Sequence, residues 1–411
     1  MLERGSTVTA PGGTRGERSP QAAGPPQAAL AAASAAAAVV DRELAPILRR
    51  LETLVAIDSG PDAPVGRERV ADLLGEWAAD IGCDVEYVAG GGGTAMVAGL
   101  PGYGSGRIVL LGHHDTVYPA GTAERRGFVL REKTALGPGV ADMKGGLMLA
   151  LAALACLAEG ERPFGVVELH SVADEESRSQ GPFMTLERTK GAEGVLVLEC
   201  ARSNGDLVLE RKSQCSLRFT ARGRAAEAGT HPEEGRSALL ALCREVLRCD
   251  ELNGMRDGLT VTVGTFHSGV SSAVVPDEAQ AELDLRAWQT ADVVWALDMV
   301  RAVSAHEGVS FEIDDVSLWP AMTATDESRR LYQTAAAVAV HLGIPAGARR
   351  SGGTSDACWA AAAGLPTLDG MGPVGGNDHS PDEYIEVASM PERCGLLVGL
   401  VTAIGLRVSA D

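Results

Sequence analysis

The sequence predicts an α/β protein with a largely parallel central sheet, into which a second, smaller α+β unit is inserted. Apolar runs of strand length alternate with helical patterns in the first half of the chain and return near its end. Between them, residues 207–318 follow a different order of elements. A length of 411 residues also exceeds what one hydrophobic core usually organises, so two folded units are expected.

The α/β unit is predicted from residues 41–206 and 319–411. Apolar residues recur at intervals of three and four between Asp41 and Asp80, which indicates amphipathic helices. Residues 145–159 are almost entirely apolar, as expected of a buried helix. Apolar runs of strand length lie at 108–111, 166–172 and 195–198.

The inserted unit, residues 207–318, has the β-α-β-β-α-β order of a ferredoxin-like fold. Strands are predicted at 216–220, 259–266, 279–288 and 309–313, with helices at 237–249 and 291–305. The α/β unit then resumes with a helix at 328–342, the turn GGTSDA at 352–357 and a short strand at 365–368.

Residues 1–40 are rich in alanine, glycine and proline and hold almost no large apolar residues, so a disordered tail is predicted. The alanine run from Ala28 is followed at once by Asp41-Arg42-Glu43, which argues against a signal peptide. No run of strongly apolar residues is long enough to predict a membrane span.

Charge and cysteine usage indicate which partners and which compartment to expect. The net charge of −19 comes from 55 acidic against 36 basic residues, and no basic stripe interleaved with aromatics is present, so nucleic acid is not an expected partner. The eight cysteines form no CxxC pair and no dense framework, which suits a reducing compartment. A cytoplasmic location is therefore expected.

Three clusters of possible ligands each follow directly on a predicted strand. His113-His114-Asp115 comes after the run IVLLG, Asp174-Glu175-Glu176 after ELHSVA, and Glu199 after VLVL. Because ligands bind beyond the carboxyl ends of the strands in an open α/β sheet, these clusters are expected to converge. Taken singly, each cluster is weak evidence: the first is most often a hydrogen-bonded pair at a loop, the second is usually a solvated turn, and Glu199 could be the first polar residue outside the sheet. Only their conjunction favours a site.

Two further residues complete a candidate metal centre. Asp142 lies just before the apolar helix, and His379 lies in a glycine-rich loop after another short strand. Imidazole and carboxylate together suit zinc, and two neighbouring ions need at least one carboxylate between them. One bridging aspartate and four terminal ligands meet that need, whereas His379 beside Asp378 and Asp382 is also compatible with a plain surface loop.

The motifs that carry these residues resemble those of the aminoacylase and carboxypeptidase family of di-zinc metallopeptidases, which includes glutamate carboxypeptidase, acetylornithine deacetylase and succinyl-diaminopimelate desuccinylase. The resemblance covers about residues 45–405, and its segments occur in the family order. They read GHHDTV (112–117), GPGVADMKGGL (137–147), ADEES (173–177), LVLE (196–199) and NDHSPDEY (377–384).

The resemblance implies a role for each residue. His113 and Glu199 would hold one zinc ion, Glu176 and His379 a second, and Asp142 would bridge them. Asp115 would orient His113, which matches the general need to fix the second nitrogen of a ligating imidazole. Glu175 would act as general base, cobalt or manganese could replace zinc, and the inserted unit, 207–318, would form a lid and the interface of a homodimer.

The residues expected to bind the substrate depart from the family pattern. Glu227 stands where relatives have the histidine of AHAG, Ala273 replaces an amide side chain, and Trp319 lies at a position that is often arginine. Arg286 matches an arginine of the carboxypeptidase branch but is equally typical of an exposed strand, and Gly353 lies in the turn GGTSDA. Since a carboxylate donates a hydrogen bond only when protonated, Glu227 predicts an altered substrate or an altered reaction.

The resemblance therefore predicts hydrolysis of an amide bond in an N-acyl amino acid, a peptide or a related small molecule. One hypothesis is that Glu227 receives a cationic group and that the usual free carboxylate of the substrate is absent or differently placed. The alternatives are a specialised biosynthetic enzyme of the same fold, which removes an acyl group or forms an amide, and a binding protein without catalysis. Glu175 weighs against the last, because metal binding alone does not need a base.

Overall fold

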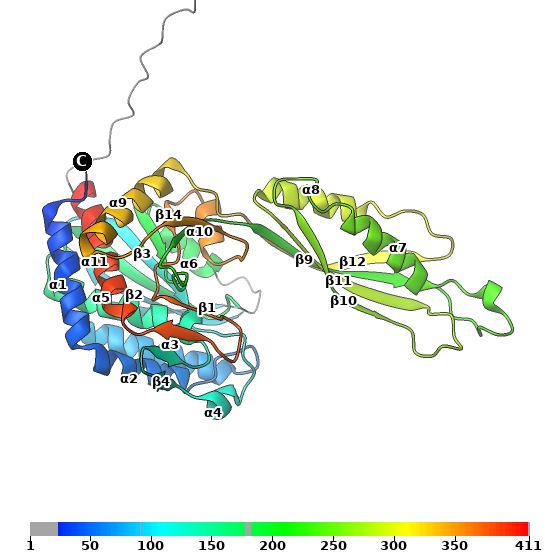
Figure 1. Cartoon of the computed structure of the whole chain (residues 1–411), viewed down its shortest axis with the longest axis horizontal. Coiled ribbons are helices and arrows are strands. Elements are labelled where there is room, and N and C mark those ends of the chain that lie inside the picture. Colours follow the sequence, from blue (N-terminus) through cyan, green and yellow to red (C-terminus); the bar gives the residue numbers. More distant parts are fainter. Residues whose placement is uncertain (1–23, 91, 177–181, 410–411) are drawn as a thin grey trace, which may run out of the picture.

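The computed structural model describes residues 24–90, 92–176 and 182–409. Figure 1 shows two bodies, an α/β unit that contains both ends of the described chain and an α+β unit joined to it by extended strands. The largely parallel fold class predicted for the first unit is confirmed by its sheet.

The main sheet of the α/β unit has the strand order β1-β2-β6-β3-β7-β14. Strands β6, β3, β7 and β14 run parallel, whereas β1 and β2 are antiparallel to their neighbours. The strands span Asp84–Gly90 (β1), Gly93–Pro101 (β2), Ser105–His113 (β3), Phe164–Val172 (β6), Gly194–Val197 (β7) and Thr367–Leu368 (β14).

Both faces of this sheet are buried, which explains the continuous apolar runs of its strands. On β3, Ile108 and Leu110 pack into the larger core, and Val109 and Leu111 pack into a second core on the opposite face. The larger core is covered by α1 (Gln27–Arg42), α2 (Leu44–Val55), α3 (Pro64–Ile81), α5 (Gly145–Glu159), α9 (Asp326–Leu342) and α11 (Ser389–Val408). The opposite face is covered by α10 (Ala357–Ala362) and α6 (Pro182–Thr189).

Helix α1 corrects the prediction that residues 1–40 form a disordered tail. Its buried residues pack along α11, where a Cβ added at Gly399 would lie only 2.8 Å from Cβ of Ala33. Alanine has the highest helix propensity, and small side chains on both helices permit this close contact. Helix α11 thus provides the packing partner that the composition of this segment does not reveal. Residues 1–23 lie outside the described part of the chain.

The inserted unit has the predicted β-α-β-β-α-β order and a wholly antiparallel sheet, β10-β11-β9-β12. Its own core contains Phe219, Leu242 and Leu283. Its elements are β9 (Ser213–Arg222), α7 (Ala238–Asp250), β10 (Thr260–Ser268), β11 (Glu278–Ala287), α8 (Thr290–Arg301) and β12 (Ser310–Trp319).

Strand β8 (Leu207–Arg211) was predicted to belong to the inserted unit but does not. It pairs in parallel with β13 (Ala348–Ser351), and Val208 forms a bridge with Asp369, so β8 packs with the α/β unit. The inserted sheet therefore begins at Ser213 rather than at residue 207. A smaller sheet, β15-β16-β5-β4, comprises Gly375–Gly376, Tyr384–Glu386, Thr134–Leu136 and Val129–Arg131.

By length and composition alone, two helical segments could span a bilayer, and the first of them contains the predicted buried helix at 145–159. They are Val140–Glu159, with 83% of its apolar window buried inside the protein, and Ser389–Val408, with 89% buried. Burial of this extent is typical of core helices, because their apolar side chains already have protein partners.

Candidate metal centre

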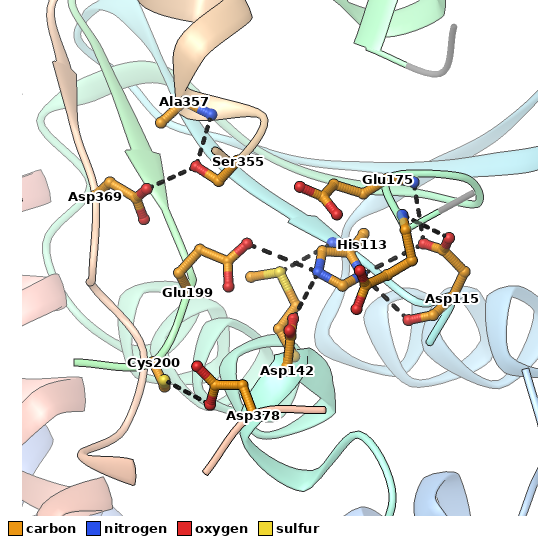
Figure 2. Close-up of polar contacts among 12 residues, drawn as sticks. His113, Asp115, Asp142, Glu175, Glu199, Cys200, Ser355, Ala357, Asp369 and Asp378 are labelled. Atoms are coloured by element: carbon orange, nitrogen blue, oxygen red, sulfur yellow. Dashed lines mark hydrogen bonds and ion pairs between the residues drawn. The ribbon is translucent and has the colours of Figure 1, made fainter. Parts of the chain in front are cut away.

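Three predicted ligand clusters meet at one edge of the main sheet. Strand β3 ends at His113, and the segments after its parallel neighbours β6 and β7 carry Glu176 and Glu199. Figure 2 shows His113, Asp142 and Glu199 facing one another at this edge. The convergence follows from strand direction, because parallel strands end on the same side of a sheet.

Asp142 lies between the two histidines and offers one carboxylate oxygen to each. Its Oδ1 is 2.9 Å from Nε2 of His113, and its Oδ2 is 3.0 Å from Nε2 of His379. It is carried by an irregular helical turn, Val140–Lys144, directly before α5. The geometry is that of a carboxylate shared by two neighbouring centres.

Each histidine has a second carboxylate of its own. Glu199 Oε1 lies 3.7 Å from Nε2 of His113, and Glu176 Oε1 lies 3.1 Å from Nε2 of His379. The structure therefore brings together all five residues that the sequence analysis placed in a metal centre, as two groups that share Asp142.

The charges in this cluster perturb one another. Hydrogen bonds with Asp142 and Glu176 raise the pKa of His379 to about 11. Burial and the charge of Asp142 raise the pKa of Glu176 to about 7. Burial disfavours ionisation of Asp142, but hydrogen bonds from the two histidines outweigh it and lower the pKa of this carboxyl. Protons on His379 and Glu176 thus reduce the negative charge of the clustered carboxylates. A bound cation could reduce this charge instead.

Asp115 fixes both a histidine and the segment that carries Glu175. Its backbone oxygen lies 3.1 Å, and its Oδ1 3.3 Å, from Nδ1 of His113. Its two carboxylate oxygens also accept hydrogen bonds from the backbone N–H groups of Glu175, at 3.2 Å, and Glu176, at 3.0 Å. His114 is not part of the centre, because its Nδ1 lies 2.9 Å from the hydroxyl oxygen of Ser171 in the interior.

Glu175 lines a cavity of about 570 Å³ together with four of the five cluster residues. Burial raises its pKa well above the usual range of a carboxyl, and the charge of Asp356 adds to this shift. A raised pKa makes the side chain a proton acceptor that can also return the proton, as general acid–base catalysis requires.

The predicted substrate-binding residues divide into two groups. Arg286, Trp319 and Gly353 line the cavity, and Arg286 donates from Nη1 to the backbone oxygen of Gly352 at 2.8 Å. Glu227 and Ala273 do not line it. Each belongs to a loop of the inserted unit, the two loops are joined by a hydrogen bond of 2.9 Å from Ala228 N to Ala273 O, and Glu227 is exposed.

Glu227 lies in the loop after the end of β9, whereas the first residues of β9 line the cavity. One of its carboxylate oxygens accepts hydrogen bonds from the backbone N–H and the hydroxyl of Thr230, both at 2.5 Å. These bonds lower the pKa of Glu227, so the side chain is an ionised acceptor that stabilises its own loop.

Two residues at the site, Arg202 and Asp356, were not predicted from the sequence. Arg202 lines the cavity, donates to the Ser351 hydroxyl at 3.3 Å and lies 3.8 Å from Asp378. Asp356 is 2% exposed, and neither of its carboxylate oxygens has a hydrogen-bond partner among the described residues. Asp356 lies in the turn GGTSDA, so its carboxylate was a detectable signal, whereas nothing in the spacing marks Arg202.

The donor set fits divalent metal ions. The ligand atoms of His113, Asp142 and Glu176 lie within 4.8 Å of one another. Imidazole nitrogens and carboxylate oxygens are donors for zinc and, with less selectivity, for cobalt and manganese.

This donor set, opening on a cavity beside a glutamate of raised pKa, defines a metal-dependent peptidase or amidohydrolase. The chain belongs to peptidase family M20/M25/M40, whose family model matches residues 109–403. The family resemblance read from the motifs is thereby confirmed, and the family is metal-dependent.

Individual relatives agree with this assignment. The chain is 28% identical over 371 residues to carboxypeptidase G2 from Pseudomonas sp. (strain RS-16), covering 87% of this chain and 89% of the relative. It is 29% identical over 299 residues to succinyl-diaminopimelate desuccinylase from Alkalilimnicola ehrlichii, covering 68% and 79%.

Solved structures show the same fold. A tripeptidase from Staphylococcus aureus has a TM-score of 0.73 at 21% identity, covering 87% of this chain and 98% of that chain. An M20 family metallo-carboxypeptidase from Sulfolobus solfataricus has a TM-score of 0.72 at 15% identity, covering 88% and 99%.

Proposed function

We propose that this protein hydrolyses the amide bond of a peptide or an N-acyl amino acid with two zinc ions bound at the cluster. The observation that carries the proposal is Asp142, whose two oxygens each face a different histidine. His113 and Glu199 would hold one ion, and His379 and Glu176 the other. The bound ions would supply Lewis acidity and lower the pKa of an attacking water.

The chain's own residues would perform the proton transfers. Glu175, which lines the cavity, takes the proton of the attacking water and gives it to the leaving amine nitrogen, so that it ends the cycle as it began. Asp115 holds Glu175 in reach through the backbone N–H and holds His113 through Nδ1. These contacts fix base and ligand relative to each other.

The arginine-lined part of the cavity favours a carboxylate of the substrate over a cationic group. Arg202 and Arg286 line the cavity and are hydrogen-bonded to adjacent residues at the end of β13, Ser351 and Gly352. The hypothesis that Glu227 receives a cationic group has no support in this geometry, because Glu227 is outside the cavity. The free carboxylate of a peptide or acyl amino acid would therefore lie on the arginine side of the cavity.

Loading and hydrolysis test the proposal directly. Metal-free protein should take up two zinc ions per chain by elemental analysis and then cleave N-acyl amino acids, while the corresponding carboxamides should be cleaved far more slowly. Uptake of no metal, or equal cleavage of acids and amides, would refute the two-zinc centre or the carboxylate requirement, respectively. Homodimerisation through the inserted unit and a cytoplasmic location stay predictions.

A further inference from the structure

Glu383 is a buried carboxylate that the ligand set does not use. It follows His379 by four residues, is 1% exposed, and has both oxygens engaged. A buried carboxylate is costly unless hydrogen bonds compensate it, so its partners indicate what it contributes to the structure.

Three of its partners are backbone groups of the segment that carries Asp142. Oε1 of Glu383 accepts hydrogen bonds from the N–H groups of Ala141, at 2.8 Å, and Asp142, at 3.0 Å. Oε2 accepts one from the N–H of Gly139, at 3.0 Å. This segment is irregular, with Gly139 at a φ of 74°, so these N–H groups lack the partners that a regular helix or strand would supply.

The fourth partner belongs to the segment that follows His113. The hydroxyl of Tyr118 lies 2.6 Å from Oε2 of Glu383 and 3.0 Å from the backbone oxygen of Ser380. One carboxylate therefore joins the segment after His113, the segment of Asp142 and the segment of His379. Two of these segments carry Asp142 and His379, and the third directly follows His113.

We propose that Glu383 is a positioning residue that sets the spacing between the two halves of the metal centre before any ion binds. The inference rests on the proposed function, since it concerns the site that would hold the ions. Its physical basis is the set of four hydrogen bonds to Glu383, which connect the Asp142 backbone and Tyr118 to the loop of His379. Charge-assisted bonds of this kind resist the repulsion among the neighbouring carboxylates.

Glu383→Gln is the direct test, because the amide keeps the shape of the side chain but replaces one acceptor oxygen with a donor. Metal-free protein is titrated with Zn²⁺ in competition with a chromophoric chelator, and the visible spectrum of the Co²⁺-loaded protein reports the coordination geometry. We expect zinc affinity to fall by about tenfold to hundredfold, the usual effect of removing a group that orients ligands, together with a changed Co²⁺ spectrum.

Asp58→Asn is the matched control for a purely structural role. Asp58 likewise accepts two backbone hydrogen bonds from a loop, from Gly121 N at 2.6 Å and Ala123 N at 2.8 Å, but that loop carries no ligand of the cluster. We expect this variant to lower the thermal unfolding temperature of the metal-free protein and to leave zinc affinity and the Co²⁺ spectrum unchanged. Equal losses of affinity in both variants would overturn the proposal.

Tyr118→Phe keeps the inference testable if Glu383→Gln does not fold. It removes one of the four bonds, so a smaller loss of zinc affinity and a smaller change in the Co²⁺ spectrum are expected. Unchanged zinc affinity in either folded variant would overturn the role of Glu383 and leave the two-zinc function intact. Failure of the unaltered protein to bind zinc would instead refute the proposed function.

Discussion

The two sides of the cavity hold their side chains in different ways. On the α/β side, His113 and Asp115 are each 1% exposed, and every carboxylate of the cluster has a histidine or backbone partner. On the inserted side, Arg286 is partly exposed and paired with Asp284, and Glu227 is bound to its own loop outside the cavity. The contrast teaches that the chemistry is set by mutually fixed groups, most of them buried although His379 is half exposed, whereas substrate choice depends on side chains that can change without disturbing them.

The sharpest test of this contrast is Glu175→Gln on the buried side. Removing the base should lower kcat by about 10²-fold to 10⁴-fold, because the proton of the attacking water loses its acceptor. Zinc content should stay at two per chain, since Glu175 is not among the proposed ligands. Activity assays and elemental analysis of the same sample check both points, and unchanged kcat would remove Glu175 from the mechanism.

The inserted side is tested by comparing Arg286→Ala with Glu227→Gln. Arg286 lines the cavity, so its loss should reduce kcat/KM for acyl amino acids by about tenfold to hundredfold, the value of a charge-assisted hydrogen bond. Glu227→Gln should change kcat/KM much less. Equal losses would show that Glu227 reaches a cavity after all, through closure of the inserted unit or through a second copy of the chain.

The packing of helix α1 against α11, in the core of the α/β unit, can be tested by substitution. Ala33 is fully buried against α11, so Ala33→Leu should lower the free energy of unfolding by about 1–3 kcal/mol through overpacking. Ala35 is exposed on the same helix, and Ala35→Leu is the matched control with no expected loss. Urea denaturation measures both, and equal stability of the two variants would contradict the docking of α1.

The smallest expected effect is the pH dependence of metal uptake. The pKa of Glu176 is raised to about 7 and that of His379 to about 11, so below pH 7 both groups are protonated and must release their protons to bind a cation. Zinc affinity should therefore fall by up to about tenfold per pH unit as the pH decreases towards 7, because His379 holds a proton, and more steeply below 7, where Glu176 holds a second. Calorimetric titration in buffers of different ionisation enthalpy counts the protons released, and uptake without proton release at pH 6 would contradict this assignment.

Much of the α/β fold was predictable because its signals are local. The run IVLLG gives a strand buried on both faces, and residues 145–159 give the buried helix α5. The β-α-β-β-α-β order of the inserted unit was equally readable, since each element has its own periodicity. Residues 27–40 were predicted wrongly, because alanine-rich composition does not reveal that α11 offers glycines for close contact.

The sequence by itself determined the ligands His113, Glu176 and Glu199 as candidates for one site, because each follows a strand and parallel strands end at one edge. The family resemblance already implied that Asp142 lies between the two histidines. Only the tertiary structure decided that Glu383 binds the backbone of the Asp142 segment and that Glu227 lies outside the cavity. The physical reason is that a local hydrophobic pattern predicts where each strand ends, whereas contacts between distant loops depend on how whole units pack.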